Sequence, residues 1–135
     1  MNDRTNLNKL KQMHTELTEY EKFFAPEMNG KRELITKQGG GTVSALYNIP
    51  DYAIARVDFK PNTVFNPHVH PELEYVIIIE GECVLTVNDI PVPLSKGTVY
   101  KIKSNFTHWM QTDETGCSMI VISVPANPQF PKTEK

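Results

Sequence analysis

The sequence predicts an all-β protein, either a β-sandwich or a closed barrel, preceded by one N-terminal α-helix. From about residue 42 onward, short runs rich in β-branched and aromatic residues alternate with turn residues, roughly every eight to twelve positions. No segment between these runs has helical periodicity, whereas residues 4 to 24 do. The chain has 135 residues, which is the length of one domain with its own hydrophobic core.

The N-terminal helix is expected over residues 4 to 24, where apolar side chains recur every three or four positions. Pro26 and the Asn29-Gly30 pair follow this segment and would end the helix. We expect its apolar stripe to pack on the domain or on a second subunit, because Lys and Arg do not dominate the polar face. The stripe consists of Leu7, Leu10, Met13, Leu17, Tyr20 and Phe24.

The elements after the helix are expected to be short strands. In the most apolar of them, residues 74 to 80, side chains on both faces are hydrophobic, so both faces should be covered. We divide the chain into a helix and linker (1–40), a β-barrel (41–126) and a C-terminal tail (127–135). Strands are expected at residues 42–48, 52–60, 63–70, 74–80, 82–88, 91–94, 98–103, 107–112 and 117–124.

Composition excludes several classes of partner. The formal net charge is −2 and the basic residues are not clustered, so neither nucleic acid nor an anionic membrane is expected as a partner. The longest purely apolar run, residues 76 to 79, is far too short to span a bilayer. Cys83 and Cys117 fit a reduced cytoplasmic protein in which they are small buried hydrophobes.

The stretch "NPHVHPELEYVIIIEG", residues 66 to 81, carries three candidate metal ligands. On a strand, residues two apart project from the same face about 7 Å apart, so His68 and His70 can converge on one ion. In one straight strand Glu74 would lie roughly 13 Å beyond His70. A bend at residues 71 to 73 would fold the carboxylate back towards the imidazoles.

A third imidazole would complete the set. The chain has four histidines, and His108 is the remaining one that is expected on a strand, just after a turn. An inward-facing His108 would give three imidazoles and one carboxylate around a common point. His14 lies in the expected helix and is interpreted as a surface residue.

These residues resemble the motifs of the small single-domain cupins. The first cupin motif reads G-x5-H-x-H-x3or4-E-x6-G, and this chain matches its spacing with His68, His70, Glu74 and Gly81. Asn62 stands where the motif opens with glycine. Since Asn tolerates a positive φ better than most residues, that replacement conserves the backbone conformation.

The second cupin motif reads G-x5-P-x-G-x2-H-x3-N, and Gly97 and His108 match it at the expected spacing. Lys103, Asn105 and Thr112 replace its proline, inner glycine and asparagine. The resemblance implies a double-stranded β-helix, or jelly roll, over roughly residues 42 to 124. It also implies a metal bound by a fixed set of ligands: His68, His70, Glu74 and His108.

Imidazoles with one carboxylate suit several divalent transition metals. The resemblance favours Fe(II) first and Mn(II) second, with Ni(II) and Zn(II) as alternatives. Tyr100, expected to face inward, could orient a substrate or move a proton as a catalytic residue. Arg56 is expected to face outward, and Glu72, in the bend, is expected to be solvated.

The functional hypothesis is a metal-dependent oxygenase of a small, partly apolar, chelating organic molecule. The side chains expected to face inward form an apolar wall without a basic cluster, which argues against phosphorylated sugars. They are Val57, Phe59, Val76, Ile78, Tyr100, Ile102 and Met110. Two alternatives stay open: a non-catalytic small-molecule binding or sensing module, and a metal-dependent isomerase or lyase. Apolar outer faces and the family's habit indicate a homodimer.

Overall fold

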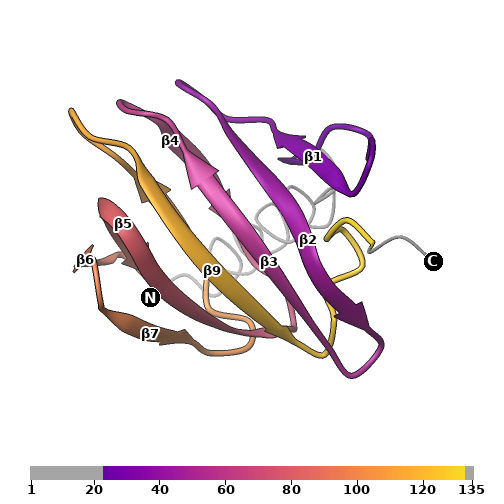
Figure 1. Ribbon diagram of the computed structural model, residues 1–135. Coiled ribbons are helices and arrows are strands. Elements are labelled where there is room, and N and C mark those ends of the chain that lie inside the picture. The colour runs from indigo at the N-terminus through magenta and orange to yellow at the C-terminus, as the bar shows by residue number, and fades with distance from the viewer. Residues whose placement is uncertain (1–22, 133–135) are drawn as a thin grey trace, which may run out of the picture.

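The computed structural model describes residues 23 to 132, and within them the chain is all-β with antiparallel pairing throughout (Figure 1). No α-helix occurs among these residues, and so none that could cross a bilayer. The strands are β1 (Lys31–Leu34), β2 (Gly41–Ile49), β3 (Tyr52–Phe59), β4 (Val64–His68), β5 (Leu73–Val87), β6 (Ile90–Ser95), β7 (Val99–Ile102), β8 (His108–Gln111) and β9 (Cys117–Val124).

The helix expected over residues 4 to 24 lies almost entirely outside the described residues. At its last position the prediction is wrong, because Phe24 forms a β-bridge with Leu34. The reason is β1, a strand that was not predicted from the sequence. The chain before it pairs with its edge, because the backbone N–H of Ala25 donates to the carbonyl of Glu33 at 2.8 Å. Phe24 and Leu34 are both buried in the core.

Two sheets share the long strand β5. The first half of β5 pairs with β9 and β7 in a sheet that continues through β3 and β2 to β1. Figure 1 shows β2, β3, β9 and β5 side by side in this curved sheet. The second half of β5 pairs with β6 and β8 in a sheet that ends at β4. The isolated bridge between Gln38 and Val64 links the connection between β1 and β2 to β4, the last strand of the second sheet.

The prediction of two strands separated by a turn at Gly81 is wrong, because β5 runs through this position without a break. Gly81 has a φ of 77°, a conformation that glycine adopts without steric cost. The register with β9 shifts between Ile78 and Glu80, so the strand bulges and changes sheet here. The glycine therefore bends the strand instead of reversing the chain.

The inward faces of both sheets enclose an apolar interior, as strict alternation along the strands requires. In β3 the side chains of Val57 and Phe59 point inward and are buried. Arg56 is exposed on the outer face, as predicted, where it pairs with Asp58 at 3.1 Å. Cys83 and Cys117 are free thiols and are buried, also as predicted.

The described part of the C-terminal tail is docked on the barrel. Asn127 is fully buried and Phe130 is 5% exposed. The guanidinium of Arg32 donates to the backbone carbonyl of Gln129 at 2.8 Å, which ties the tail to β1. Residues 127 to 132 therefore form part of the structure that surrounds the barrel interior.

Candidate metal centre

Strands β4 and β8 bring two imidazoles together. His68 is the last residue of β4 and His108 is the first of β8, and the two are direct cross-strand partners. Directly opposed residues project from the same face of a sheet. Their ring centroids are accordingly 4.2 Å apart, and both side chains are buried in the barrel.

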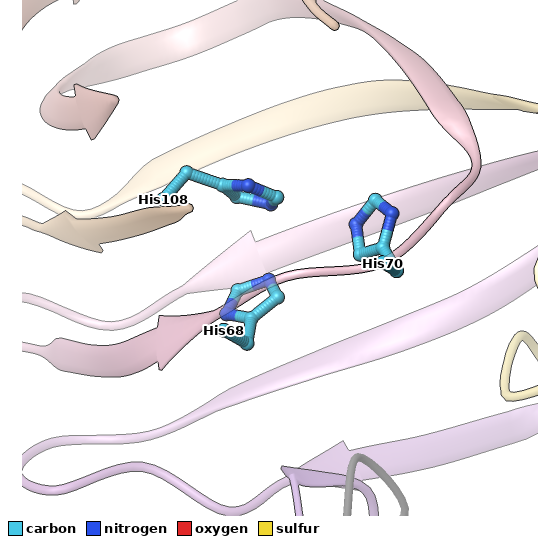
Figure 2. Close-up of side chains that lie close together, drawn as sticks. All are labelled: His68, His70 and His108. Atoms are coloured by element: carbon cyan, nitrogen blue, oxygen red, sulfur yellow. The ribbon is translucent and has the colours of Figure 1, made fainter. Parts of the chain in front are cut away.

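The third imidazole comes from the bend between β4 and β5. His70 lies two residues beyond the end of β4, whereas the sequence analysis placed it inside the strand. The bend is held in place because the backbone N–H of Asn105 donates to the carbonyl of His70 at 2.9 Å. The candidate ligand nitrogens of His68, His70 and His108 all lie within 4.8 Å of one another, and Figure 2 shows the rings facing one another.

Each imidazole is oriented by a backbone carbonyl two residues away. The Nδ1 atoms of His68, His70 and His108 lie 2.8, 3.1 and 2.9 Å from the carbonyl oxygens of Asn66, Glu72 and Phe106. A carbonyl oxygen can only accept, so each Nδ1 carries the proton and donates it. In the neutral rings the lone pair then resides on Nε2, which is the tautomer that a metal requires.

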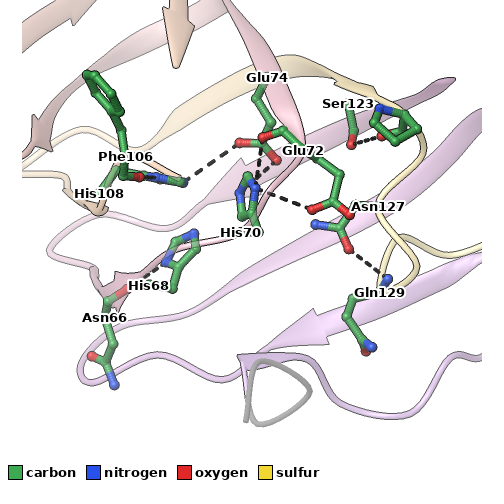
Figure 3. A network of polar contacts seen from close by, with 11 residues as sticks. Asn66, His68, His70, Glu72, Glu74, Phe106, His108, Ser123, Asn127 and Gln129 are labelled. Carbon is green, nitrogen blue, oxygen red and sulfur yellow. Dashed lines mark hydrogen bonds and ion pairs between the residues drawn. The ribbon is translucent and has the colours of Figure 1, made fainter. Parts of the chain in front are cut away.

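Glu74 stands beside two of the three rings. Its carboxylate oxygens lie 3.4 Å from Nε2 of His70 and 3.8 Å from Nε2 of His108 (Figure 3). The bend thus returns the carboxylate to the imidazoles, as predicted from the sequence. Glu74 is not part of the compact three-histidine cluster, so its role as a fourth metal ligand stays a prediction.

The electrostatics of the site keep two of the rings neutral. Burial lowers the pKa of His68 well below its ordinary value, and the neighbouring His108 lowers it further. Burial also lowers the pKa of His108, although Glu74 opposes the shift. Neutral imidazoles are the ligating form, because protonation would occupy the lone pair on Nε2.

His70 and Glu74 shift each other's pKa. Burial lowers the pKa of His70. The negative charge of Glu74 and the interaction of its carboxylate with the imidazole outweigh burial, and Glu72 adds to their effect, so the pKa of His70 is raised above its ordinary value. Burial raises the pKa of Glu74, but His70 and then His108 outweigh burial and lower it. Glu74 is therefore an anion in the folded protein, as a carboxylate ligand has to be.

The residues present fit a divalent metal. Nε2 of His108 is buried and makes no hydrogen bond among the described residues. A buried polar atom without a hydrogen-bond partner is costly unless something else satisfies it. Nε2 of His108 belongs to the three-histidine cluster, and its lone pair is available to bind a metal ion. The cluster of His68, His70 and His108 could therefore bind a divalent metal.

An apolar cavity of about 60 Å³ adjoins the imidazoles, with His68, Glu74 and His108 in its wall. Most of the side chains expected to face inward do line it; they are Val57, Phe59, Val76, Ile102 and Met110. Ile78 is buried but does not line the cavity. Lys and Arg side chains do not line it in the described part of the chain.

Tyr100 is not brought into the cavity wall. It pairs with Val76 across β7 and β5, so it is on the inward face of the sheet as expected. Its side chain is half-buried and packs against the core, but it does not border the cavity beside the imidazoles. A catalytic role for Tyr100 stays a prediction.

Sequence reasoning missed Glu72 as a residue of the site. It was expected to be solvated, but it is only 8% exposed, so that expectation is wrong. Its carboxylate lies 3.5 Å from Nδ1 of His70. The reason is the bend, which turns residue 72 inward behind His70 instead of towards solvent. The acidic pattern "HPELE" was the available signal.

The residues that replace motif glycines and the motif asparagine support the backbone conformation. Asn62 and Asn105 have φ angles of 57° and 64°, the left-handed conformation that glycine adopts without steric cost and that Asn tolerates. Thr112 is buried, and its hydroxyl donates to the carbonyl of Lys60 at 2.6 Å and accepts from the backbone N–H of Thr63. Thr112 thereby fixes the end of β8 against the chain that enters β4.

A family model described as a cupin domain matches residues 55 to 125. The chain belongs to the cupin family. This range contains both motifs and all four predicted metal ligands, so the resemblance drawn from the motifs is confirmed. The two curled antiparallel sheets are the jelly roll that this cupin was predicted to form.

Solved structures support the fold. A protein from Thermotoga maritima described as a predicted oxalate decarboxylase superposes with a TM-score of 0.62 at 22% identity, covering 76% of this chain and 93% of that one. An RmlC-like cupin from Shewanella frigidimarina gives 0.60 at 15% identity, covering 82% and 90%. KdgF from a Halomonas species gives 0.59 at 17% identity, covering 81% and 91%. At these identities the likeness concerns the fold alone.

One curated relative matches by sequence. The β-conglycinin α′ subunit of Glycine max is 30% identical over 89 residues, which is 61% of this cupin. The match spans 14% of the length of that subunit.

Proposed function

We propose that this cupin is a metal-dependent enzyme acting on a small, partly apolar, chelating organic molecule, and specifically an oxygenase. The observation that carries the proposal is the buried cluster of three imidazoles, each holding its Nδ1–H against a backbone carbonyl. A bound divalent ion, Fe(II) in the first instance and Mn(II) in the second, would supply Lewis acidity and activation of dioxygen.

The residues around such an ion would have three roles: binding the metal, orienting the imidazoles and lining the substrate side. His68, His70 and His108 would hold it, with Glu74 as the carboxylate ligand. The three carbonyl acceptors fix the tautomer and direction of each ring before the metal arrives, which reduces the ordering cost of binding. The apolar wall would limit contact with bulk water on the side where a substrate would lie.

The charges of the site favour a neutral or singly anionic substrate. Glu72 and Glu74 are both buried beside His70, so they balance the two positive charges of a divalent ion. Without Lys or Arg in the described cavity wall, nothing there would compensate a phosphate group or a second carboxylate. A volume near 60 Å³ holds only a few water molecules, so the buried part of the substrate is small.

The cavity wall favours chemistry at a metal over acid–base chemistry alone. Its titratable side chains among the described residues are His68, Glu74 and His108, which are all candidate ligands. An isomerase or lyase would need a further proton-transfer group, and Tyr100 does not border the cavity. Replacing Tyr100 with Phe tests that alternative: an isomerase that uses the phenol would lose turnover, whereas the oxygenase would keep most of it.

The proposed function is tested by metal analysis followed by oxygen consumption. Protein purified without added metal is analysed for elemental content, then loaded with Fe(II) or Mn(II) under anaerobic conditions. We expect one ion per chain, and oxygen uptake that requires both the ion and a neutral or singly anionic bidentate chelator. The absence of stoichiometric metal would overturn the metal site. Metal binding without oxygen uptake for any such compound would overturn the oxygenase assignment.

The non-catalytic alternative predicts a different result from the same experiment. A small-molecule binding or sensing cupin would retain a ligand in the apolar cavity and release it unchanged. Mass spectrometry of the denatured protein and of the incubation mixture separates the two functions, since a binding module gives ligand without product.

We further propose a reduced cytoplasmic setting, which the two free buried thiols support. Quantifying thiols in protein denatured directly from cells tests it. Two free thiols per chain are expected, and an intramolecular disulfide would contradict it.

A further inference from the structure

The bend that carries His70 places a second carboxylate behind its imidazole ring. Nε2 of His70 faces Glu74 at 3.4 Å on the side of the candidate metal, and Nδ1 lies 3.5 Å from Oε1 of Glu72 on the other side. Figure 3 shows the ring between the two carboxylates, with the Asn127 side chain next to Glu72. Within residues 23 to 132, the Nδ1 atoms of His68 and His108 contact the backbone carbonyls of Asn66 and Phe106, whereas Nδ1 of His70 also faces a carboxylate.

Burial makes this second carboxylate expensive. Glu72 is 8% exposed, and His70 is its ion-pair partner within residues 23 to 132. A buried carboxylate without a strong cationic partner lowers stability unless another interaction compensates. The compensation available here is the Nδ1–H of His70, which also contacts the backbone carbonyl of Glu72 at 3.1 Å.

We propose that Glu72 is a positioning residue of the metal centre, which holds His70 in its ligating orientation and strengthens Nε2 as an electron donor. A carboxylate beside the protonated nitrogen of an imidazole orients the ring and increases the electron density on the other nitrogen. This inference rests on the proposed metal site. It adds a residue that neither cupin motif specifies, since position 72 falls in the variable spacer between the second histidine and the glutamate of the first motif.

The test compares Glu72→Gln with wild type and with Glu80→Gln as a matched control. Gln keeps the shape of the side chain and removes its charge, and the control makes the same change at an exposed carboxylate on β5. Zn(II) alone is the probe, and its Kd is measured by competition with a chromophoric chelator. We expect Glu72→Gln to raise the Kd about tenfold, and Glu80→Gln to leave it within twofold.

A second readout separates positioning from a merely structural role. In ¹⁵N-labelled, Zn(II)-loaded protein, the ring nitrogen resonances of His70 should shift in Glu72→Gln while those of His68 and His108 stay in place. A raised Kd with unchanged His70 resonances would overturn the inference, and so would an unchanged Kd. If Glu72→Gln does not fold, Glu72→Asp is judged by the same two criteria.

This experiment distinguishes the inference from the proposed function. Wild type that fails to bind Zn(II), Fe(II) or Mn(II) would overturn the metal site itself. Wild type that binds the ion as tightly as Glu72→Gln does would overturn only the role of Glu72.

Discussion

At the scale of single residues, the metal centre is built from local backbone geometry. Each imidazole donates to a carbonyl only two positions away, so the ring direction is set within its own segment. What distant parts of the chain contribute is the convergence of the three rings. A substitution at one ring should therefore remove a ligand without disturbing the orientation of the other two.

Removing His108 should abolish stoichiometric metal binding. The remaining imidazoles would have lost a partner whose ring centroid lies 4.2 Å from that of His68. We expect His108→Ala to contain less than about a tenth of the wild-type metal after dialysis, by elemental analysis. The control is His14→Ala, which replaces the histidine outside the motifs. Unchanged occupancy in His108→Ala would show that the ligand set is wrong.

Glu74→Gln should weaken the metal site without abolishing it. The variant keeps the three imidazoles and loses the anionic oxygens that face His70 and His108. An affinity loss of about 10- to 100-fold is expected by titration with Zn(II). An affinity equal to that of wild type would exclude Glu74 as a ligand.

At the scale of elements, steric limits on φ determine which residues fit at two glycine positions of the motifs, Gly81 and Gly97. Gly81 and Gly97 have φ angles of 77° and 91°, which L-residues other than Asn rarely adopt. They differ in their surroundings. A Cβ at Gly97 would meet no atom within 4 Å, whereas one at Gly81 would overlap the carbonyl oxygen of Gly116.

This difference predicts unequal costs for two identical substitutions. Gly97→Ala should lower the free energy of unfolding by about 1 kcal/mol, the cost of a left-handed alanine. Gly81→Ala should cost about 3 kcal/mol or more, because the paired backbones of β5 and β9 would have to move apart at Gly116. Urea denaturation of both variants measures the difference. Equal losses would show that overlap with Gly116 does not matter.

The strands of the barrel could be predicted better than their continuity and pairing. Runs of β-branched and aromatic residues between turn residues located every strand from β2 to β9, although β5 was predicted as two strands. The motif spacing identified the three histidines that converge. The continuity of β5 was missed because a glycine between two apolar runs suggests a turn, and only its pairing with both sheets shows that the strand continues through Gly81. β1 was missed because "KREL" has no β-branched residue, and its pairing with β2 is a tertiary contact.

At the scale of the whole molecule, the outer face of the β2–β3–β9–β5–β7 sheet is apolar. Cross-strand register aligns two rows of side chains on it: Tyr47, Ile54, Ile122 and Tyr75 in one, and Arg56, Ile120, Ile77 and Val99 in the other. Val99 is 61% exposed and Tyr47 is 47% exposed. Large contiguous apolar surfaces of this kind are typical of subunit interfaces.

We predict that a second copy of this chain covers this face in a homodimer. Arg56 and Asp58 lie side by side on it, so two copies related by a two-fold axis could exchange this pair and remain self-complementary in charge. Light scattering should give the mass of a dimer for wild type and of a monomer for Ile120→Asp. The control is Ile90→Asp, at an exposed position on β6. A monomeric wild type, or a dimeric Ile120→Asp, would contradict the prediction.

The strand shared by the two sheets also has a consequence for the order of assembly. Glu74 is the second residue of β5 and His108 pairs with Val87, the last one, and a straight strand would separate Glu74 from Val87 by roughly 40 Å. The 3.8 Å contact between Glu74 and His108 therefore exists only after β5 has curled and both sheets have closed. An ion held there would stabilise a contact formed late in folding. It should slow unfolding markedly while leaving the folding rate nearly unchanged, so metal would act on the lifetime of the native protein.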